Sequence, residues 1–146
     1  MIINQPVFTV LLVEDETADA DLVRMAFEES RLLVTLHHVV DGVEALKFLR
    51  RETEAFAAVP RPDLILLDLN MPRMNGREFL QEVKQDDSLR PIPVVVLTTS
   101  DVERDIVESY GLGAAGYVVK PVDLDQLIHA IQGMERYWFT VVKLPQ

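Results

Sequence analysis

The chain has 146 residues, and its 24 acidic and 14 basic side chains give a formal net charge of −10. This length fits one domain, which buries roughly 68–70% of the surface that its unfolded chain exposes and needs no disulfide or structural metal to fold. The absence of cysteine excludes a thiol nucleophile and Cys-ligated metal sites. The acidic balance argues against direct nucleic-acid binding, and no apolar run approaches the ~20 residues of a membrane helix. We therefore expect a cytoplasmic protein without nucleic-acid or membrane contacts.

Short apolar runs alternate with helical patterns along the chain. The runs are rich in Val, Ile and Leu, which favours strands covered on both faces: Val10–Val13, the weaker Val34–Val40, Leu64–Leu67, Val94–Leu97 and Tyr117–Val119. Apolar residues at helical spacing follow each run, within 22–27, 46–49, 79–83, 106–110 and 124–138. Five strand-then-helix units predict an α/β fold, a doubly wound parallel sheet with helices on both faces. The segments Arg51–Pro62 and Gln85–Pro93 are predicted to be loops.

Chemically reactive side chains stand at the carboxyl ends of four predicted strands. Glu14 and Asp15 follow the first strand and Asp68 the third, while Thr98 and Lys120 end the fourth and fifth. Open α/β sheets bind ligands outside the carboxyl ends of their strands. We therefore expect three carboxylates, a hydroxyl and an ammonium at one edge of the sheet.

This combination is suited to a phosphoryl group. Three clustered carboxylates repel one another, and a hard cation such as Mg²⁺, which needs only one or two carboxylates, removes the repulsion. Lys120 supplies a point positive charge for phosphate oxygens, and Thr98 supplies a hydroxyl donor. Asp68 is the natural nucleophile, because carboxylates form aspartyl-phosphates.

Four segments resemble the receiver domain of two-component response regulators: Val13–Asp15, Leu67–Pro72, Leu97–Ser100 and Val119–Pro121. The resemblance covers roughly residues 7 to 136, and the spacing from Thr98 to Lys120 (120 − 98 = 22 residues) also matches that family. It implies the flavodoxin-like strand order 2-1-3-4-5. It also implies a phosphoacceptor of a sensor histidine kinase, which assists its own phosphorylation and slow dephosphorylation but is not an enzyme in the usual sense.

The resemblance also implies roles for individual residues. Asp68 would be the phosphoacceptor that forms 4-aspartylphosphate. Mg²⁺ would be held by Asp15, Asp68 and the backbone carbonyl of Asn70, with Glu14 acting on the metal directly or through water.

Three further residues would act on the phosphoryl group or respond to it. Thr98 would hydrogen-bond the phosphoryl group and Lys120 would pair with it. Tyr117 occupies the aromatic switch position, with simple packing as the alternative, and Gly76 stands where the loop after the phosphoacceptor turns into the third helix.

Two other classes of protein are weighed against this interpretation. A phosphatase of the haloacid dehalogenase kind requires a second Asp two residues after the nucleophile, where this chain has Asn70. A flavodoxin-like electron carrier requires a phosphate loop rich in Ser, Thr or Gly after the first strand, where this chain has Glu14–Glu16. His37 and His38 are adjacent in a predicted strand and so face opposite sides, which argues against a shared metal.

We expect the receiver domain to span 1–136, a C-terminal extension to span 137–146, and no output domain to follow. Tyr137, Trp138 and Phe139 are consecutive and cannot all face one core from a helix. Packing on the same domain and a partner or dimer contact both remain open; we expect a homodimer. This ending and the long Arg51–Pro62 loop resemble the small single-domain regulators associated with phytochromes, which suggests a phytochrome as the kinase.

Overall fold

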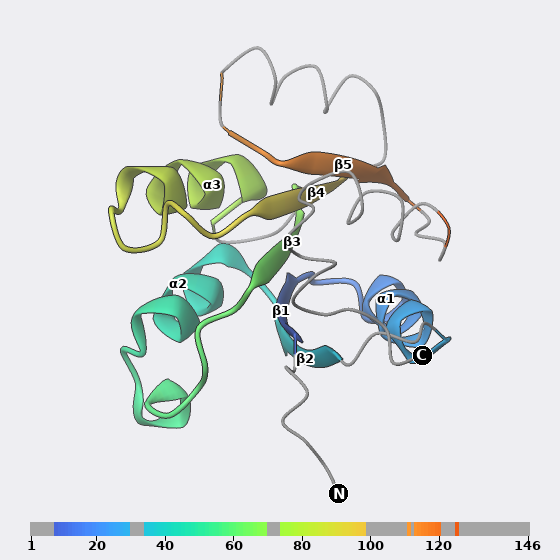
Figure 1. The fold of residues 1–146 in the computed structure, drawn as a ribbon, viewed down its shortest axis with the longest axis horizontal. Helices are drawn as coiled ribbons and strands as arrows, with labels where there is room; N and C mark the ends of the chain where they lie inside the picture. Colours follow the sequence, from blue (N-terminus) through green and yellow to red (C-terminus); the bar gives the residue numbers. More distant parts are fainter. Residues whose placement is uncertain are drawn as a thin grey trace, which may run out of the picture.

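The sheet has five parallel strands in the order β2-β1-β3-β4-β5, with helices on both faces (Figure 1). The structure is a computed structural model that describes residues 8–29, 34–69, 74–98, 111, 113–120 and 125. The strands are β1 (Phe8–Val13), β2 (Val34–Val39), β3 (Leu64–Asp68), β4 (Val94–Thr98) and β5 (Gly116–Val119). The helices are α1 (Thr17–Glu29), α2 (Gly42–Arg50) and α3 (Gly76–Gln85), with a 3₁₀ turn η1 (Glu54–Phe56). The predicted α/β fold and strand order are confirmed.

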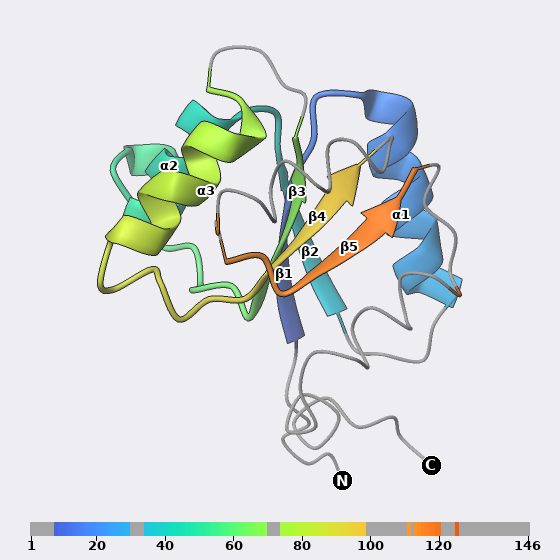
Figure 2. The same ribbon diagram turned by 90° about the horizontal axis from the view of Figure 1, so that it is seen from above.

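Helix α1 covers one face of the sheet, and α2 and α3 cover the other (Figures 1 and 2). Every residue of β1, β3 and β4 is buried, as expected for strands covered on both faces. Alternate β1 residues serve the two cores: Leu11 and Val13 pack on the α2–α3 side, and Val10 and Leu12 pack on the α1 side. Burial of each such side chain stabilises the fold by roughly 1.5–3 kcal/mol.

All strands run in the same direction, so their carboxyl ends lie at one edge of the sheet (Figure 2). The register places Val13 beside Val39 of β2 and Leu67 of β3. At the other side of the sheet, Thr98 of β4 pairs with Val119 of β5. Glu14, Asp68 and Lys120, which follow Val13, Leu67 and Val119, therefore reach the same edge.

The segment predicted as an irregular loop, Arg51–Pro62, contains the turn η1. Arg51 ends α2 in the left-handed region at φ 52°, and its Nε donates a hydrogen bond to the Val59 carbonyl at 2.9 Å. Phe56 of η1 packs on Phe48 of α2 with ring centroids 5.3 Å apart. The segment is thus held to α2 by the contact between Phe56 and Phe48, which no periodic pattern in the sequence predicts.

The predicted helices in 106–110 and 124–138 lie outside the described residues, apart from Asp125. Across the described parts of the chain, every helix is too short or too polar to cross a membrane.

Candidate functional site

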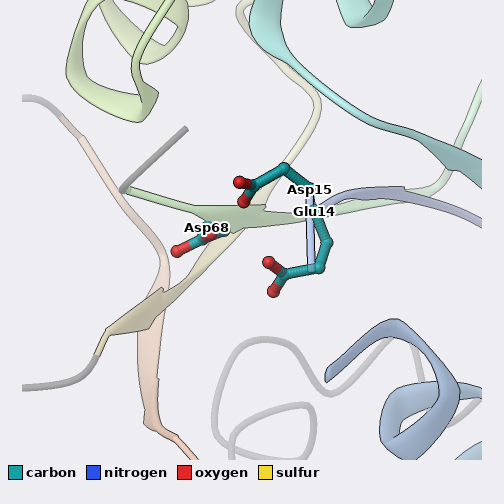
Figure 3. A group of neighbouring side chains, drawn as sticks. All are labelled: Glu14, Asp15 and Asp68. Atoms are coloured by element: carbon teal, nitrogen blue, oxygen red, sulfur yellow. The ribbon is translucent and has the colours of Figure 1, made fainter. Parts of the chain in front are cut away.

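Three carboxylates meet at the edge formed by the ends of β1 and β3 (Figure 3). Glu14 and Asp15 follow β1, and Asp68 is the last residue of β3. One carboxylate oxygen of each lies within 4.8 Å of the others. Glu14 and Asp68 are buried and Asp15 is exposed, so the cluster opens to solvent on the side of Asp15.

Lys120 brings a positive charge into this cluster from the end of β5. Its backbone N–H donates to the Thr98 carbonyl at 2.8 Å, which fixes the residue beside the end of β4. Its side chain is only 8% exposed. Its Nζ lies near the carboxylate oxygens of three residues: 2.7 Å from Glu14 Oε1, 3.0 Å from Asp19 Oδ2 and 3.4 Å from Asp68 Oδ1.

The surrounding carboxylates keep the Lys120 ammonium charged. Burial alone would lower the pKa of Lys120, but the contacts with Glu14, Asp19 and Asp68 outweigh burial and raise the pKa above its ordinary 10.5. Because the pKa of Lys120 is higher in the folded protein than in the unfolded chain, the ion pairs of Lys120 contribute their full stabilisation of the fold below pH 10.5. This contribution is lost only as the pH rises through the higher folded-state pKa. At neutral pH the site therefore holds a fixed positive charge.

The two oxygens of the buried Glu14 carboxylate contact different partners. Its Oε2 accepts a hydrogen bond from the backbone N–H of Glu16 at 3.2 Å. Its Oε1 forms the 2.7 Å ion pair with Lys120 but has no well-directed hydrogen bond to any residue in the described part of the chain. The buried carboxylate of Glu14 lies beside the carboxylates of Asp15 and Asp68. Such hard oxygen ligands are those that Mg²⁺ and related cations prefer. The residues therefore fit a divalent metal.

His38 fixes the backbone that carries the acidic pair. Its Nε2 lies 2.7 Å from the Glu14 carbonyl, and because a carbonyl only accepts, this nitrogen carries the proton. The Glu14 backbone N–H donates in turn to the Val39 carbonyl at 3.0 Å. His37 points the other way and packs on Phe48, with ring centroids 5.3 Å apart. Sequence reasoning considered these histidines only as metal ligands and missed the supporting role of His38.

Thr98 and Tyr117, which the sequence also predicts for the site, lie within the described residues. Thr98 is buried at the carboxyl end of β4, beside β5. Tyr117 of β5 is half-buried and packs against the core cluster on the α2–α3 side of the sheet. Asn70 and the three aromatic residues Tyr137, Trp138 and Phe139 lie outside the described residues.

Asp19 is a member of the site that sequence reasoning missed. It lies in the first turn of α1 and accepts a hydrogen bond from Lys120 Nζ, which is 101 residues away in the chain. The one feature of the sequence that could have indicated Asp19 is the position of a carboxylate in the first helical turn after the acidic pair. Carboxylates are common at helix N-termini for electrostatic reasons alone, so this feature does not single out a site residue.

Gly76 allows the start of α3 to lie against the backbone that follows Asp68. A Cβ at this position would lie 2.5 Å from Leu69 Cα and 2.7 Å from the Asp68 carbonyl oxygen. Gly76→Ala is therefore expected to displace the backbone at Asp68, lower the free energy of unfolding by about 1–3 kcal/mol and weaken divalent-cation binding. Urea unfolding and calorimetric titration with Mg²⁺ measure the two effects.

Gly116→Ala is the matched control, because among the described residues its Cβ would meet only Val95 Cγ2, at an ordinary 3.8 Å. This variant should keep the Mg²⁺ affinity of the wild type. Equal Mg²⁺ affinities in the Gly76→Ala and wild-type proteins would show that the close approach does not shape the site.

Comparisons with known proteins agree with this geometry. The family model "Response regulator receiver domain" matches residues 10–132. Response regulator Rcp1 of Synechocystis sp. is 44% identical over 142 residues, which cover 97% of this chain and 96% of that protein. The crystal structure of its Mn²⁺-bound form has a TM-score of 0.73 at 43% identity and covers 95% of this chain and 99% of that one.

Two other solved structures are similar over most of their length. The bacteriophytochrome response regulator RtBRR has a TM-score of 0.86 at 43% identity, and the match covers 95% of this chain and 84% of that one. The phosphorylated cyanobacterial phytochrome response regulator RcpA has a TM-score of 0.76 at 44% identity, with coverage of 96% and 99%.

Proposed function

Because this chain belongs to the response regulator receiver domain family of two-component signalling proteins, we propose that it accepts a phosphoryl group from a sensor histidine kinase on Asp68. One observation carries the proposal. The Asp68 carboxylate ends the central strand β3 within a cluster of acidic side chains, and its Oδ1 lies 3.4 Å from the Lys120 ammonium. A nucleophile is thus placed beside a fixed positive charge.

The transfer needs little covalent chemistry from the protein. An Asp68 carboxylate oxygen forms the bond to phosphorus as the phosphorus–nitrogen bond to the kinase histidine breaks, and the electron pair of that bond stays on the imidazole. Catalysis of such transfers is almost entirely positioning and charge stabilisation. Lys120 would neutralise charge on the phosphoryl oxygens, and the Thr98 hydroxyl would donate a hydrogen bond to one of them.

Mg²⁺ is the metal that we propose for the carboxylate cluster. Asp15, Asp68 and the backbone carbonyl of Asn70 would hold it, and Glu14 would contact it directly or through water. When bound, the ion supplies charge neutralisation for the transferring phosphoryl group. The similar Rcp1 has an Mn²⁺-bound structure, which supports binding of a divalent cation by this chain.

Asp15→Asn is expected to weaken Mg²⁺ binding by at least about tenfold, because loss of a metal ligand costs more than loss of an outer-shell partner. Calorimetric titration of the metal-free protein measures the affinity. Glu16→Gln removes the same charge from the next residue, which is outside the carboxylate cluster, and should leave the affinity within about twofold of the wild type. Equal losses of Mg²⁺ affinity in the two variants would show that Asp15 acts through its charge alone and not as a metal ligand.

A phosphotransfer experiment tests the function directly. A panel of autophosphorylated histidine kinases, including phytochromes, is mixed with the purified chain, and the label is followed on gels. Rapid loss of label from one kinase with its appearance on this chain is the expected result. Similarity to RtBRR and RcpA supports a phytochrome as the donor. Label that stays on every kinase would argue against the proposal.

The two alternatives are not favoured. The matching family and the similar proteins are response regulators, not phosphatases of the haloacid dehalogenase kind or flavin carriers. We propose that the signal passes from the phosphoryl group through Thr98 and Tyr117 to a protein partner. We also propose that the receiver domain spans 1–136 and that a C-terminal extension spans 137–146. A cytoplasmic location remains a prediction.

We further propose a homodimer with Tyr137, Trp138 and Phe139 in the contact. The support is the sequence, since three consecutive aromatic side chains cannot all face one core. A two-fold dimer that buries at least ~1,000 Å² would cover them. Deletion of 137–146 is expected to convert the dimer into a monomer that still accepts phosphate, and sedimentation velocity measures the change. A full-length protein that is monomeric with and without beryllofluoride would contradict the dimer.

A further inference from the structure

The contact between Lys120 and Asp19 has the geometry of a hydrogen bond, whereas the contact between Lys120 and Asp68 is long. Nζ donates to Asp19 Oδ2 at 3.0 Å, inside the usual range for N–H···O hydrogen bonds. The distance from Nζ to Asp68 Oδ1 is 3.4 Å, outside that range. The ammonium therefore lies closer to Asp19 of α1 and to Glu14, at 2.7 Å, than to Asp68.

The proposed function needs Lys120 elsewhere. An ammonium has three N–H donors, and pairing with a phosphoryl group on Asp68 requires it to turn at least one of them toward the new oxygens. A shift of the ammonium toward these oxygens draws it away from one of its two nearer partners, Glu14 or Asp19. The partner that is given up should be the one whose carboxylate loses least when it is left without the ammonium.

Exposure identifies that partner. The side chain of Glu14 is 0% exposed, so its carboxylate would be left without water if the ammonium withdrew from it. Leaving a buried charge uncompensated is strongly unfavourable. The side chain of Asp19 is 27% exposed and lies in the first turn of α1, where water and the positive end of the helix dipole stabilise a carboxylate. Asp19 can therefore release Lys120 at low cost.

We propose that Asp19 is a positioning residue that holds the Lys120 ammonium on the α1 side of the acidic cluster in the unphosphorylated protein, and that the phosphoryl group displaces Asp19 from Lys120. This inference rests on the proposed function of Asp68. It makes Asp19 and the phosphoryl group competitors for one ammonium, so that Asp19 favours the unphosphorylated state.

The test compares Asp19→Asn with Asp21→Asn in the full chain. Asp21 lies on the same helix, is 61% exposed and pairs with Arg24, so its replacement makes the same change in net charge away from Lys120. Beryllofluoride affinity is measured by calorimetry at saturating Mg²⁺. Asp19→Asn should bind beryllofluoride about fivefold more tightly than the wild type, the lower end of typical couplings between two ligands. Asp21→Asn should bind as the wild type does.

Two further measurements separate competition from a merely structural role. Asp19→Glu keeps the charge and should return the affinity toward the wild-type value. In the unphosphorylated protein, the ¹⁵N resonance of the Lys120 ammonium should shift in Asp19→Asn and stay in place in Asp21→Asn. A structural role alone would predict weaker beryllofluoride binding in both Asp19 variants.

The outcomes distinguish this inference from the proposed function. If the wild type binds beryllofluoride and Asp19→Asn binds it equally or more weakly, the role of Asp19 is overturned and the phosphoacceptor stands. Equal tightening in Asp19→Asn and Asp21→Asn would also overturn it, as a general charge effect. If the wild type neither binds beryllofluoride nor accepts phosphate, the proposed function falls and this inference falls with it.

Discussion

Replacement of Lys120 by methionine is expected to lower the free energy of unfolding by about 3–5 kcal/mol in metal-free buffer, the usual cost of removing one partner from a buried ion pair. The variant leaves the buried carboxylates of Glu14 and Asp68 without their counter-charge. Saturating Mg²⁺ should restore much of the loss, because a divalent cation at the carboxylate cluster supplies the missing positive charge. Urea unfolding with chelator and with Mg²⁺ measures both quantities.

Lys84→Met is the matched control. The Lys84 ammonium donates hydrogen bonds to the carbonyls of Arg90 and Ile92, and no carboxylate is among these partners. Its replacement should destabilise the protein without rescue by Mg²⁺. If Lys120→Met is as stable as the wild type without metal, or if Mg²⁺ stabilises the two variants equally, the account of the charge balance at the site is wrong.

Asp68→Asn is expected to abolish phosphorylation by acetyl phosphate, a loss of at least about 10³-fold in rate, as for removal of the nucleophile of an enzyme. The amide lacks the carboxylate oxygen that forms the bond to phosphorus. Without metal, the variant should be at least as stable as the wild type, because one of several clustered negative charges is gone. Intact-mass spectrometry follows the phosphorylation, and urea unfolding confirms the fold.

Asp87→Asn makes the same substitution at a side chain that is 89% exposed and pairs with Arg90, and it should be phosphorylated at the wild-type rate. Asp68→Asn that takes up one phosphoryl group at the wild-type rate would refute the assignment of Asp68. An unfolded Asp68→Asn protein would contradict the expected relief of repulsion.

The fold was predictable from local patterns because its strands are covered on both faces. Leu64–Leu67 and Val94–Leu97 are uninterrupted apolar runs, and the structure buries every residue in them. The weaker prediction, Val34–Val40, reflects a strand at the edge of the sheet with partly exposed residues. The strand order came from the resemblance to receiver domains, since apolar runs report burial but not which strands are neighbours.

The gathering of reactive side chains was predictable in outline because parallel strands share one edge for their carboxyl ends. The partners within the site were not. The Lys120–Asp19 hydrogen bond joins residues 101 positions apart, and the His38 contact reaches the backbone carbonyl of Glu14, just after the neighbouring strand. Such pairings depend on side-chain lengths and strand register, which leave no periodic trace in the sequence.

The most direct test of the central claim locates the phosphoryl group. The chain is phosphorylated by acetyl phosphate with Mg²⁺, reduced with borohydride, which converts an aspartyl-phosphate to homoserine, and digested for peptide mass spectrometry. We expect homoserine at position 68 in the wild type and none in Asp68→Asn. Homoserine or phosphate at another residue, or an unmodified position 68 in a protein that has taken up phosphate, would contradict it.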